Sequence, residues 1–178
     1  MILIPGIVIA IATFPGVIVH EAAHLFFCRV RKVAVFEVCF FRIGNPVGYV
    51  VHEKTDNFTT SLLISVGPFM INSLFCIVFC FPAFVPVRIF GQVDPVSYFW
   101  IWLGISIGMH AFPSTQDARV LWEAAREAAR AGNLIALVSF PLVALIYVAN
   151  LLSFLWFDTL YGLAIGLALP ELLFRKLV

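Results

Sequence analysis

The chain has 178 residues, of which 62% are hydrophobic and only 12% are charged, and its formal net charge is +1. With a mean hydropathy of +1.04, it has too little polar surface to cover a soluble globule, so we expect an integral membrane protein in a lipid bilayer. It has no basic patch and no Lys/Arg-rich run with interleaved aromatic residues, which excludes nucleic acid as an expected partner.

The first apolar stretch runs from Ile2 to Val30, long enough to cross a membrane, which takes about 20 residues. It has no basic start and no small-residue cleavage pattern, so we interpret it as a retained span rather than a signal peptide. Residues 20–24 within it read HEAAH, an HExxH motif. On a helix, His20 and His24 share a face and can bind one zinc ion, with Glu21 placed as the general base.

The alternative is that the HExxH motif is a coincidence and that its side chains form hydrogen bonds inside a helix bundle. An unpaired carboxylate and two imidazoles within a bilayer are costly, which favours a functional site. His24 lies about 9 Å before the end of the predicted span at Val30, at 1.5 Å per residue. The motif is therefore predicted near one face of the membrane.

A β-hairpin is predicted after the first span. Val33 to Phe41 and Val47 to His52 are rich in Val and Phe, and the Ile43-Gly44-Asn45-Pro46 segment between them carries strong turn signals. An open strand edge cannot face lipid, so we expect this apolar hairpin to lie against the helices or at the membrane interface. Its edge would then be available to pair with an extended peptide.

Two further spans are predicted from Leu62 to Phe84 and from Val96 to Phe112. Asn72 follows a Gly67-Pro68 break in the first of them, where its amide can either hold a substrate backbone or pack between helices. His110, at the end of the other, can be a fourth ligand, a hydrogen-bond donor to a reacting carbonyl, or a packed histidine. These alternatives stay open at the level of the sequence.

Asp117 follows the third predicted span and is the candidate third ligand, because a catalytic zinc ion usually has three protein ligands. In the predicted topology, this part of the chain lies on the same side of the membrane as the HExxH motif. The alternative is a carboxylate that only stabilises the start of a helix through the helix dipole. The segment from Asp117 to Arg130 alternates charge with apolar residues at helical spacing and is predicted to form an interfacial helix.

Two C-terminal spans, Leu134 to Leu152 and Leu155 to Phe174, complete a prediction of five. We place their break near residues 153–158, because Asp158 at the bilayer centre would cost about 3 kcal/mol. With five spans, Arg88 is the only basic residue on its side of the membrane. By the positive-inside tendency that side is the outer one, so the N-terminus is outside and the candidate site is near the cytoplasmic face. The basic residues on the cytoplasmic side would be Arg29, Arg31, Lys32, Arg42, Lys54, Arg119, Arg126, Arg130, Arg175 and Lys176.

We expect a single membrane domain over residues 1–178, with a catalytic core at about 1–117 and an accessory region at 118–178. The chain has four cysteines and no CxxC pair, so we predict that the cysteines pack as small buried hydrophobic residues. They are Cys28, Cys39, Cys76 and Cys80.

Three motifs in this order resemble the site-2 protease family of intramembrane zinc metalloproteases. They are HEAAH in one span, GPFMIN (Gly67 to Asn72) in the next, and a proline-containing segment that ends in Asp117. The resemblance covers roughly Val17 to Asp117. It implies that His20, His24 and Asp117 bind one zinc ion, that Glu21 is the general base, and that the hairpin presents the substrate as an added strand.

The chain departs from the family pattern at three points. His110 stands where the family usually has Asn, the spacing from Pro113 to Asp117 is one residue shorter than is common, and Ala118 replaces the usual Gly. These departures concern the segment that carries the third ligand and leave the HExxH motif intact.

We therefore expect an all-α polytopic zinc metalloendopeptidase with a small cytoplasmic hairpin, which cleaves a transmembrane or juxtamembrane segment of a membrane-protein substrate. One alternative is a non-catalytic metal-binding scaffold or a transporter, although ion paths usually recruit ionisable groups along several spans. Another is a different HExxH membrane peptidase whose third ligand is a later glutamate. The candidates for that ligand are Glu123, Glu127 and Glu171.

Overall fold

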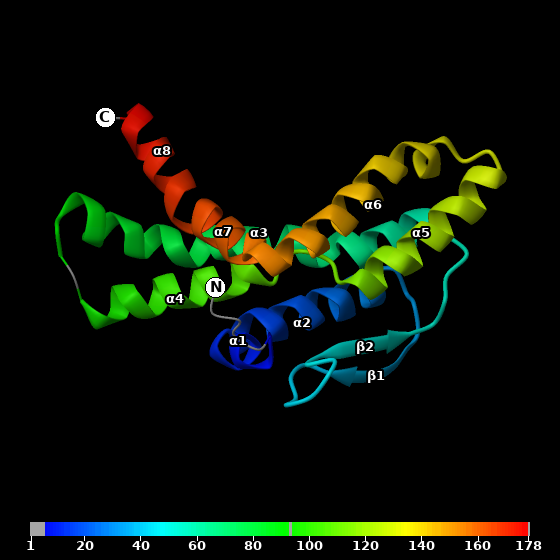
Figure 1. The fold of residues 1–178 in the computed structure, drawn as a ribbon, viewed down its shortest axis with the longest axis horizontal. Helices are drawn as coiled ribbons and strands as arrows, with labels where there is room; N and C mark the ends of the chain where they lie inside the picture. The colour runs from blue at the N-terminus through cyan, green and yellow to red at the C-terminus, as the bar shows by residue number, and fades with distance from the viewer. Residues whose placement is uncertain (1–5, 93, 178) are drawn as a thin grey trace.

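The computed structural model describes residues 6–92 and 94–177, and it confirms an all-helical architecture with one small hairpin (Figure 1). The described part of the chain has two α-helices, then a two-stranded sheet, and then six more α-helices. The elements are α1 (Gly6–Ala12), α2 (Phe14–Val30), β1 (Val35–Cys39), β2 (Tyr49–His52), α3 (Phe58–Ile89), α4 (Pro95–Met109), α5 (Thr115–Arg130), α6 (Leu134–Leu152), α7 (Phe157–Leu163) and α8 (Leu169–Leu177).

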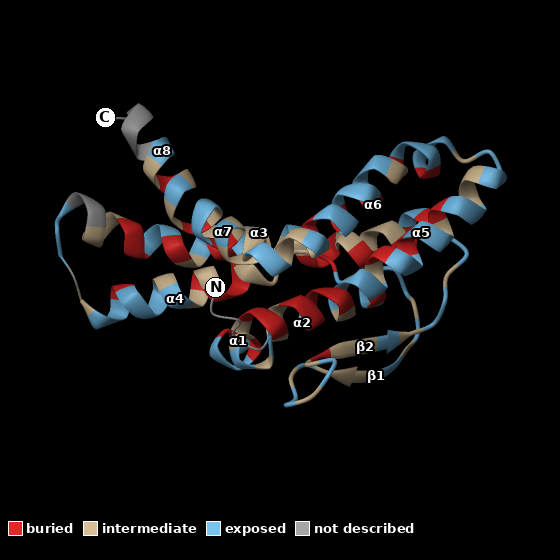
Figure 2. Ribbon diagram, viewed as in Figure 1, coloured by how far each residue is buried: buried red, intermediate tan, exposed pale blue. Residues whose placement is uncertain are grey.

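The long helix α3 is the centre of the arrangement, and α2 and α4 pack on it and on each other. Buried residues gather where these three helices meet (Figure 2). A second group of buried residues joins the start of α3 to α5 and α6, and includes Leu121 of α5 and Val143 of α6. The predicted interfacial helix is confirmed as a helix, α5, and its buried face packs against α6.

Two helical segments have the length and hydropathy to cross a membrane, Phe58–Val87 and Leu134–Leu155. A third qualifies if α1 and α2, bent by 86°, are taken as one broken span. This is compatible with a membrane protein, but among the described residues the prediction of five spans is wrong by this test. The apolar helix α4 has 15 residues, about 22 Å of helix, which is shorter than the hydrocarbon core of about 30 Å.

The first predicted span, Ile2 to Val30, is broken at Thr13, and its first residues lie outside the described part of the chain. Pro15 occupies the first turn of α2. Proline has no N–H to bond back to α1 and restricts the backbone of the residue before it. The apolar run therefore forms two helices, and α2 carries the HExxH motif alone.

The last predicted span is also interrupted. A short 3₁₀ turn, Ser153–Leu155, ends α6, and Trp156 has a positive φ of 64°, so the break lies where we predicted it. Beyond it the chain continues away from α5 (Figure 1), and a π-helical segment, Ala164–Ala168, separates α7 from α8. These short helices do not pass the span test, and Gly162 of α7 packs against the backbone of α4.

The predicted hairpin is confirmed with shorter strands. β1 and β2 are antiparallel, and Arg42 N–H and Glu53 N–H donate across the sheet to the carbonyls of Val47 and Ala34. Alternate residues of a strand direct their backbone groups to the same edge. The N–H and C=O groups of residues 48, 50 and 52 therefore face the free edge of β2.

All four cysteines are free, and three of them are buried. Cys28, Cys76 and Cys80 thus confirm the prediction of small buried residues, whereas Cys39 is only partly buried.

Candidate metal centre

The two histidines of the HExxH motif meet Asp117 at the start of α5. One ligand atom from each of His20, His24 and Asp117 lies within 4.8 Å of the other two. The Nε2 atoms of the two histidines are 3.2 Å apart, and His24 Nε2 is 3.6 Å from Asp117 Oδ1. Residues from opposite halves of the sequence therefore form one group of potential ligands.

Two of these distances match the separation between ligand atoms in a tetrahedral metal site. Ligand atoms about 2.0–2.1 Å from a zinc ion at tetrahedral angles are about 3.4 Å from each other. The two measured separations, 3.2 and 3.6 Å, lie on either side of that value. The third separation, between His20 and Asp117, is within 4.8 Å, so a modest movement would bring all three side chains onto one ion, and the adjoining cavity has room for water or substrate.

The outer nitrogens of both imidazoles are held by backbone carbonyls. His20 Nδ1 is 2.7 Å from the carbonyl oxygen of His110, and His24 Nδ1 is 2.9 Å from that of Ile64. A carbonyl oxygen only accepts, so each Nδ1 carries the hydrogen and each neutral imidazole has a lone pair on Nε2. Two lone pairs 3.2 Å apart beside a carboxylate require a cation or a shared proton between them.

A capping box fixes the orientation of Asp117. Its Oδ2 accepts from Ser114 N–H at 2.8 Å and from Ser114 Oγ–H at 2.6 Å, while Asp117 N–H donates to Ser114 Oγ at 3.2 Å. Oδ1 is left to face His24. Both sequence interpretations of Asp117 are therefore compatible, because one oxygen serves the helix and the other faces the histidines.

The carboxyl of Asp117 is held in its charged form. Burial by itself would raise the pKa of this group, but the neighbouring His24 and the hydrogen bond from Ser114 lower it well below its usual range. A carboxylate that stays ionised and faces two imidazole lone pairs is a strong cation ligand.

Glu21 lies next to this group and is itself almost buried, at 8% exposure. It lines a cavity of about 180 Å³ together with the three candidate ligands, the free edge of β2 and the start of α5. The backbone of Gly48 lies so close to it that a Cβ at this position would be 2.7 Å from Glu21 Cγ. The hairpin therefore covers the glutamate from one side.

Asn72 is completely buried, and its amide nitrogen is bonded to the protein, whereas Oδ1 has no hydrogen-bond partner among the described residues. Its Nδ2 donates to the carbonyls of Gly16, Ile107 and His110, at 3.3, 3.1 and 3.0 Å, and so ties α3 to α2 and α4. No substrate reaches it in this conformation. The geometry favours the packing interpretation and gives Asn72 an indirect part in the centre, because the His110 carbonyl also holds His20.

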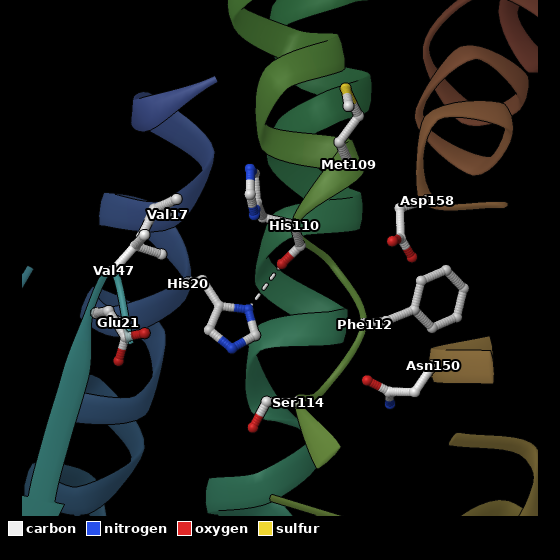
Figure 3. A pocket seen from close by; sticks show the side chains of 10 residues that line it. All are labelled: Val17, His20, Glu21, Val47, Met109, His110, Phe112, Ser114, Asn150 and Asp158. Atoms are coloured by element: carbon white, nitrogen blue, oxygen red, sulfur yellow. Dashed lines mark hydrogen bonds between the residues drawn. The ribbon is translucent and has the colours of Figure 1, made fainter. Parts of the chain in front are cut away.

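His110 contributes through its backbone rather than its ring. Its imidazole Nε2 is 2.8 Å from Thr13 Oγ1 and the ring is not part of the ligand group. Figure 3 shows its carbonyl oxygen directed at His20 Nδ1 and its ring turned away from that contact. Among the interpretations left open by the sequence, the geometry favours a packed histidine over a fourth ligand.

Sequence reasoning missed three residues around this centre. Ser114 had a signal, since Ser-x-x-Asp before an apolar helix is a capping-box pattern. Asn150 is the only amide in α6, and its Nδ2 donates to the carbonyls of Pro113 and Ile146, both at 2.9 Å. Asp158 was assigned to a turn, yet it lines a second cavity beside Glu21.

The glutamates considered as alternative third ligands are not in the ligand group found among the described residues. Glu123 and Glu127 are exposed on α5, and Glu171 lies on α8. Asp117 is thus the carboxylate that the fold brings to the two histidines.

Comparison of the chain with known protein families, with curated proteins and with solved structures gave no match. The resemblance to the site-2 proteases rests on the HExxH, GPFMIN and Asp117 motifs alone. The enzymatic activity that this resemblance implies is therefore taken up as a proposal.

Proposed function

We propose that this protein is a membrane-embedded zinc metalloendopeptidase. The observation that carries the proposal is that ligand atoms of His20, His24 and Asp117 lie within 4.8 Å of one another beside the carboxylate of Glu21, with His24 3.2 Å from His20 and 3.6 Å from Asp117. Two imidazoles, one carboxylate and an open side toward a cavity are the pattern of a catalytic rather than a structural zinc site.

His20, His24 and Asp117 would hold the ion, and the carbonyls of residues 64 and 110 would fix the two rings. When bound, zinc supplies a Lewis acid that polarises a peptide carbonyl and lowers the pKa of water toward about 7. The donor set also suits other first-row divalent ions, and the tetrahedral spacing favours zinc among them.

Glu21 is the group placed to move the proton. It borders the same cavity as the candidate ligands and has little contact with solvent. It would take a proton from the attacking water and give it to the amine that leaves the cleaved bond. No other carboxylate besides Asp117, which is committed to His24 and Ser114, lines this cavity in the described part of the chain.

The free edge of β2 is a second observation in favour of a peptide substrate. Gly48, Val50 and His52 direct backbone groups to this edge, and all three line the cavity that contains the candidate ligands. An extended peptide that paired with the edge would run past the metal centre with its carbonyls exposed. The pairing would offset part of the cost of unwinding a substrate helix.

A membrane-protein substrate follows from the location of the site. α6 exposes large apolar side chains along its length, including Leu134, Val138 and Leu145, as expected of a helix in contact with lipid. We place the N-terminus outside and the centre near the cytoplasmic face, because Arg29, Arg31 and Lys32 follow the HExxH motif directly. The cleaved bond would lie within or beside a transmembrane segment.

The test compares the full-length parent with Glu21→Gln and with Glu123→Gln, an exposed glutamate on α5, after reconstitution in lipid. Zinc content and cleavage of a transmembrane reporter are measured for each. We expect one zinc ion per chain in all three proteins and cleavage by all except Glu21→Gln. Cleavage by Glu21→Gln at the parental rate would refute the mechanism, and zinc binding without cleavage by the parent would favour a non-catalytic scaffold.

A further inference from the structure

A second cavity lies next to the metal centre. It also has a volume of about 180 Å³, and it shares His20, Glu21 and Ser114 with the first cavity. In Figure 3, Asn150 and Asp158 lie on one side of it, and Val17, Glu21 and Val47 lie on the opposite side. A peptide that crosses the metal centre therefore has room for one side chain here.

Glu21 and Asp158 are the two carboxylates in this cavity, and since Glu21 is already assigned as the proposed general base, Asp158 is the one left without a role. Among the described residues its carboxylate forms no hydrogen bond or ion pair, although it lies in the first turn of α7. By contrast, Asp94 and Asp117 both bind the start of their own helices. Burial is the cause that raises the pKa of Asp158 to about 6, and no nearby cation counteracts it.

The other polar groups of the cavity already have a partner or a proposed role: His20 and His110 are hydrogen-bonded, and Glu21 is the proposed general base. Asn150 uses its amide hydrogens on the carbonyls of Pro113 and Ile146, and its Oδ1 accepts from Thr115 Oγ1–H. Ser114 is held in the capping box. The remaining walls are formed by apolar side chains, among them Val17, Met109 and Phe112.

We propose that this cavity is a substrate side-chain subsite and that Asp158 makes it select a Lys or Arg residue next to the cleaved bond. The proposal rests on the proposed peptidase function and adds the substrate class. A long basic side chain matches the cavity, because its methylene stem can lie on the apolar walls while its charged end pairs with Asp158. An acidic side chain would face the carboxylate and be rejected.

The expected substrate follows from the charge pattern of membrane proteins. Transmembrane segments carry Lys and Arg mainly at their cytoplasmic ends. With the metal centre near that face, a basic residue at the end of a substrate span would reach Asp158 while the adjacent backbone lay along β2. The subsite would thus direct cleavage to the basic cytoplasmic flank of a span.

The test measures binding in the inactive Glu21→Gln background, so that it does not depend on turnover. The probes are synthetic transmembrane peptides with one Lys moved through successive positions of an otherwise uncharged flank, and a matching series with Met. We expect at least one Lys position to bind about tenfold more tightly than its Met counterpart. Asp158→Asn should abolish this preference. The matched control is Asp56→Asn, which neutralises an exposed carboxyl outside the cavity and should leave the preference intact.

A charge-reversal variant distinguishes loss of the subsite from misfolding, because a misfolded protein would not gain a new preference. Asp158→Lys should prefer a Glu peptide at the position where the parent prefers Lys. Equal binding of the Lys and Met series, or an undiminished Lys preference in Asp158→Asn, would overturn the subsite. If Lys preference depends on Asp158 but the active parent cleaves none of the peptides, the subsite stands and the peptidase function fails. If the active parent cleaves the peptides but shows no Lys preference, the peptidase function stands and the subsite fails.

Discussion

Gly48 and Glu21 are in such close contact that a single added methyl group would not fit between them. A Cβ at residue 48 would lie 2.7 Å from Glu21 Cγ and 3.1 Å from the Phe40 carbonyl oxygen. The hairpin therefore packs directly against the side chain of the proposed general base. A glycine outside α2 limits the orientations that Glu21 can adopt.

Gly48→Ala should consequently reduce cleavage without removing the metal. The added methyl must displace Glu21 or the hairpin, and a displacement of about 1 Å at a reacting group costs about a hundredfold in rate. Zinc content should not change, because residue 48 contacts none of the three ligands through this methyl. The matched control is Gly44→Ala, whose Cβ would meet nothing closer than 3.6 Å and should leave the rate intact. Parental activity in Gly48→Ala would show that this contact does not orient Glu21.

Asp117 and its cap should affect metal affinity to different degrees. Asp117→Ala removes a ligand and should abolish tight zinc binding. Ser114→Ala leaves the carboxylate and the backbone N–H bond to Oδ2 but removes the hydroxyl that also donates to it, and loss of such an orienting contact weakens metal binding by about 10- to 100-fold. Isothermal titration with zinc in detergent distinguishes these two results from the parent.

The control for the cap is Asn133→Ala. Asn133 caps α6 through Ile135 N–H and Ala136 N–H, so its loss should cost about 1 kcal/mol of stability, as the loss of Ser114 does. It should leave zinc affinity unchanged. Equal affinity loss in Ser114→Ala and Asn133→Ala would mean that helix stability, not orientation of Asp117, explains the effect.

The sequence was informative where one local pattern determines the outcome. HExxH places two histidines on one helical face, the β-branched runs around a Gly-Asn-Pro turn give a hairpin, and α6 has the bounds predicted from its apolar run. Asp117 as the third candidate ligand needed the order of the motifs as well, because no local pattern brings residue 117 to residue 24.

The number of spans was not predictable from hydropathy alone. The run from Ile2 to Val30 is apolar throughout, yet Pro15 divides it, and the run after Leu152 contains a left-handed Trp156 and a π-helical segment that no composition window detects. The contacts of Asn72 and His110 could not be predicted from the sequence either. Both depend on tertiary contacts with backbone carbonyls, which leave no trace in the sequence.

Removal of the metal should destabilise the protein. Without a metal ion, only a shared proton can relieve the repulsion between the two imidazole lone pairs and the Asp117 carboxylate, which lie 3.2 and 3.6 Å apart. Free zinc at about a thousand times its Kd stabilises the folded state by about 4 kcal/mol, which corresponds to roughly 10 °C in Tm for a chain of this size. A chelator should therefore lower the Tm of the parent, as followed by intrinsic tryptophan fluorescence, but not that of His24→Ala. An identical response in both proteins would place the metal elsewhere.

Asn72→Ala should lower stability rather than substrate affinity. The amide is fully buried and donates to three carbonyls, so its loss removes three contacts between α3 and its neighbours and leaves a cavity, at a cost of about 1–3 kcal/mol. Zinc affinity should fall slightly, since the His110 carbonyl that holds His20 loses one donor. The KM for a reporter should not change.

Ser106→Ala is the control for Asn72→Ala. Its hydroxyl is also buried in α4 but has no hydrogen-bond partner among the described residues, so the substitution should be close to neutral. A rise in KM for Asn72→Ala without loss of Tm would restore Asn72 as a substrate-binding residue, the interpretation that the packing of α2, α3 and α4 disfavours.

The free edge of β2 can be tested with the substitution Val50→Pro. Arg42 N–H and Glu53 N–H bond across the hairpin to the carbonyls of Val47 and Ala34, so by strand alternation the N–H of Val50 faces the cavity instead of β1. Proline removes that N–H without breaking a bond of the hairpin. We expect a peptide reporter to bind more weakly, with KM raised about tenfold from the loss of one backbone hydrogen bond. Zinc content should be parental, and Val50→Thr, which keeps the N–H, should behave as the parent. A parental KM in Val50→Pro would mean that substrate reaches the metal centre without adding a strand to β2.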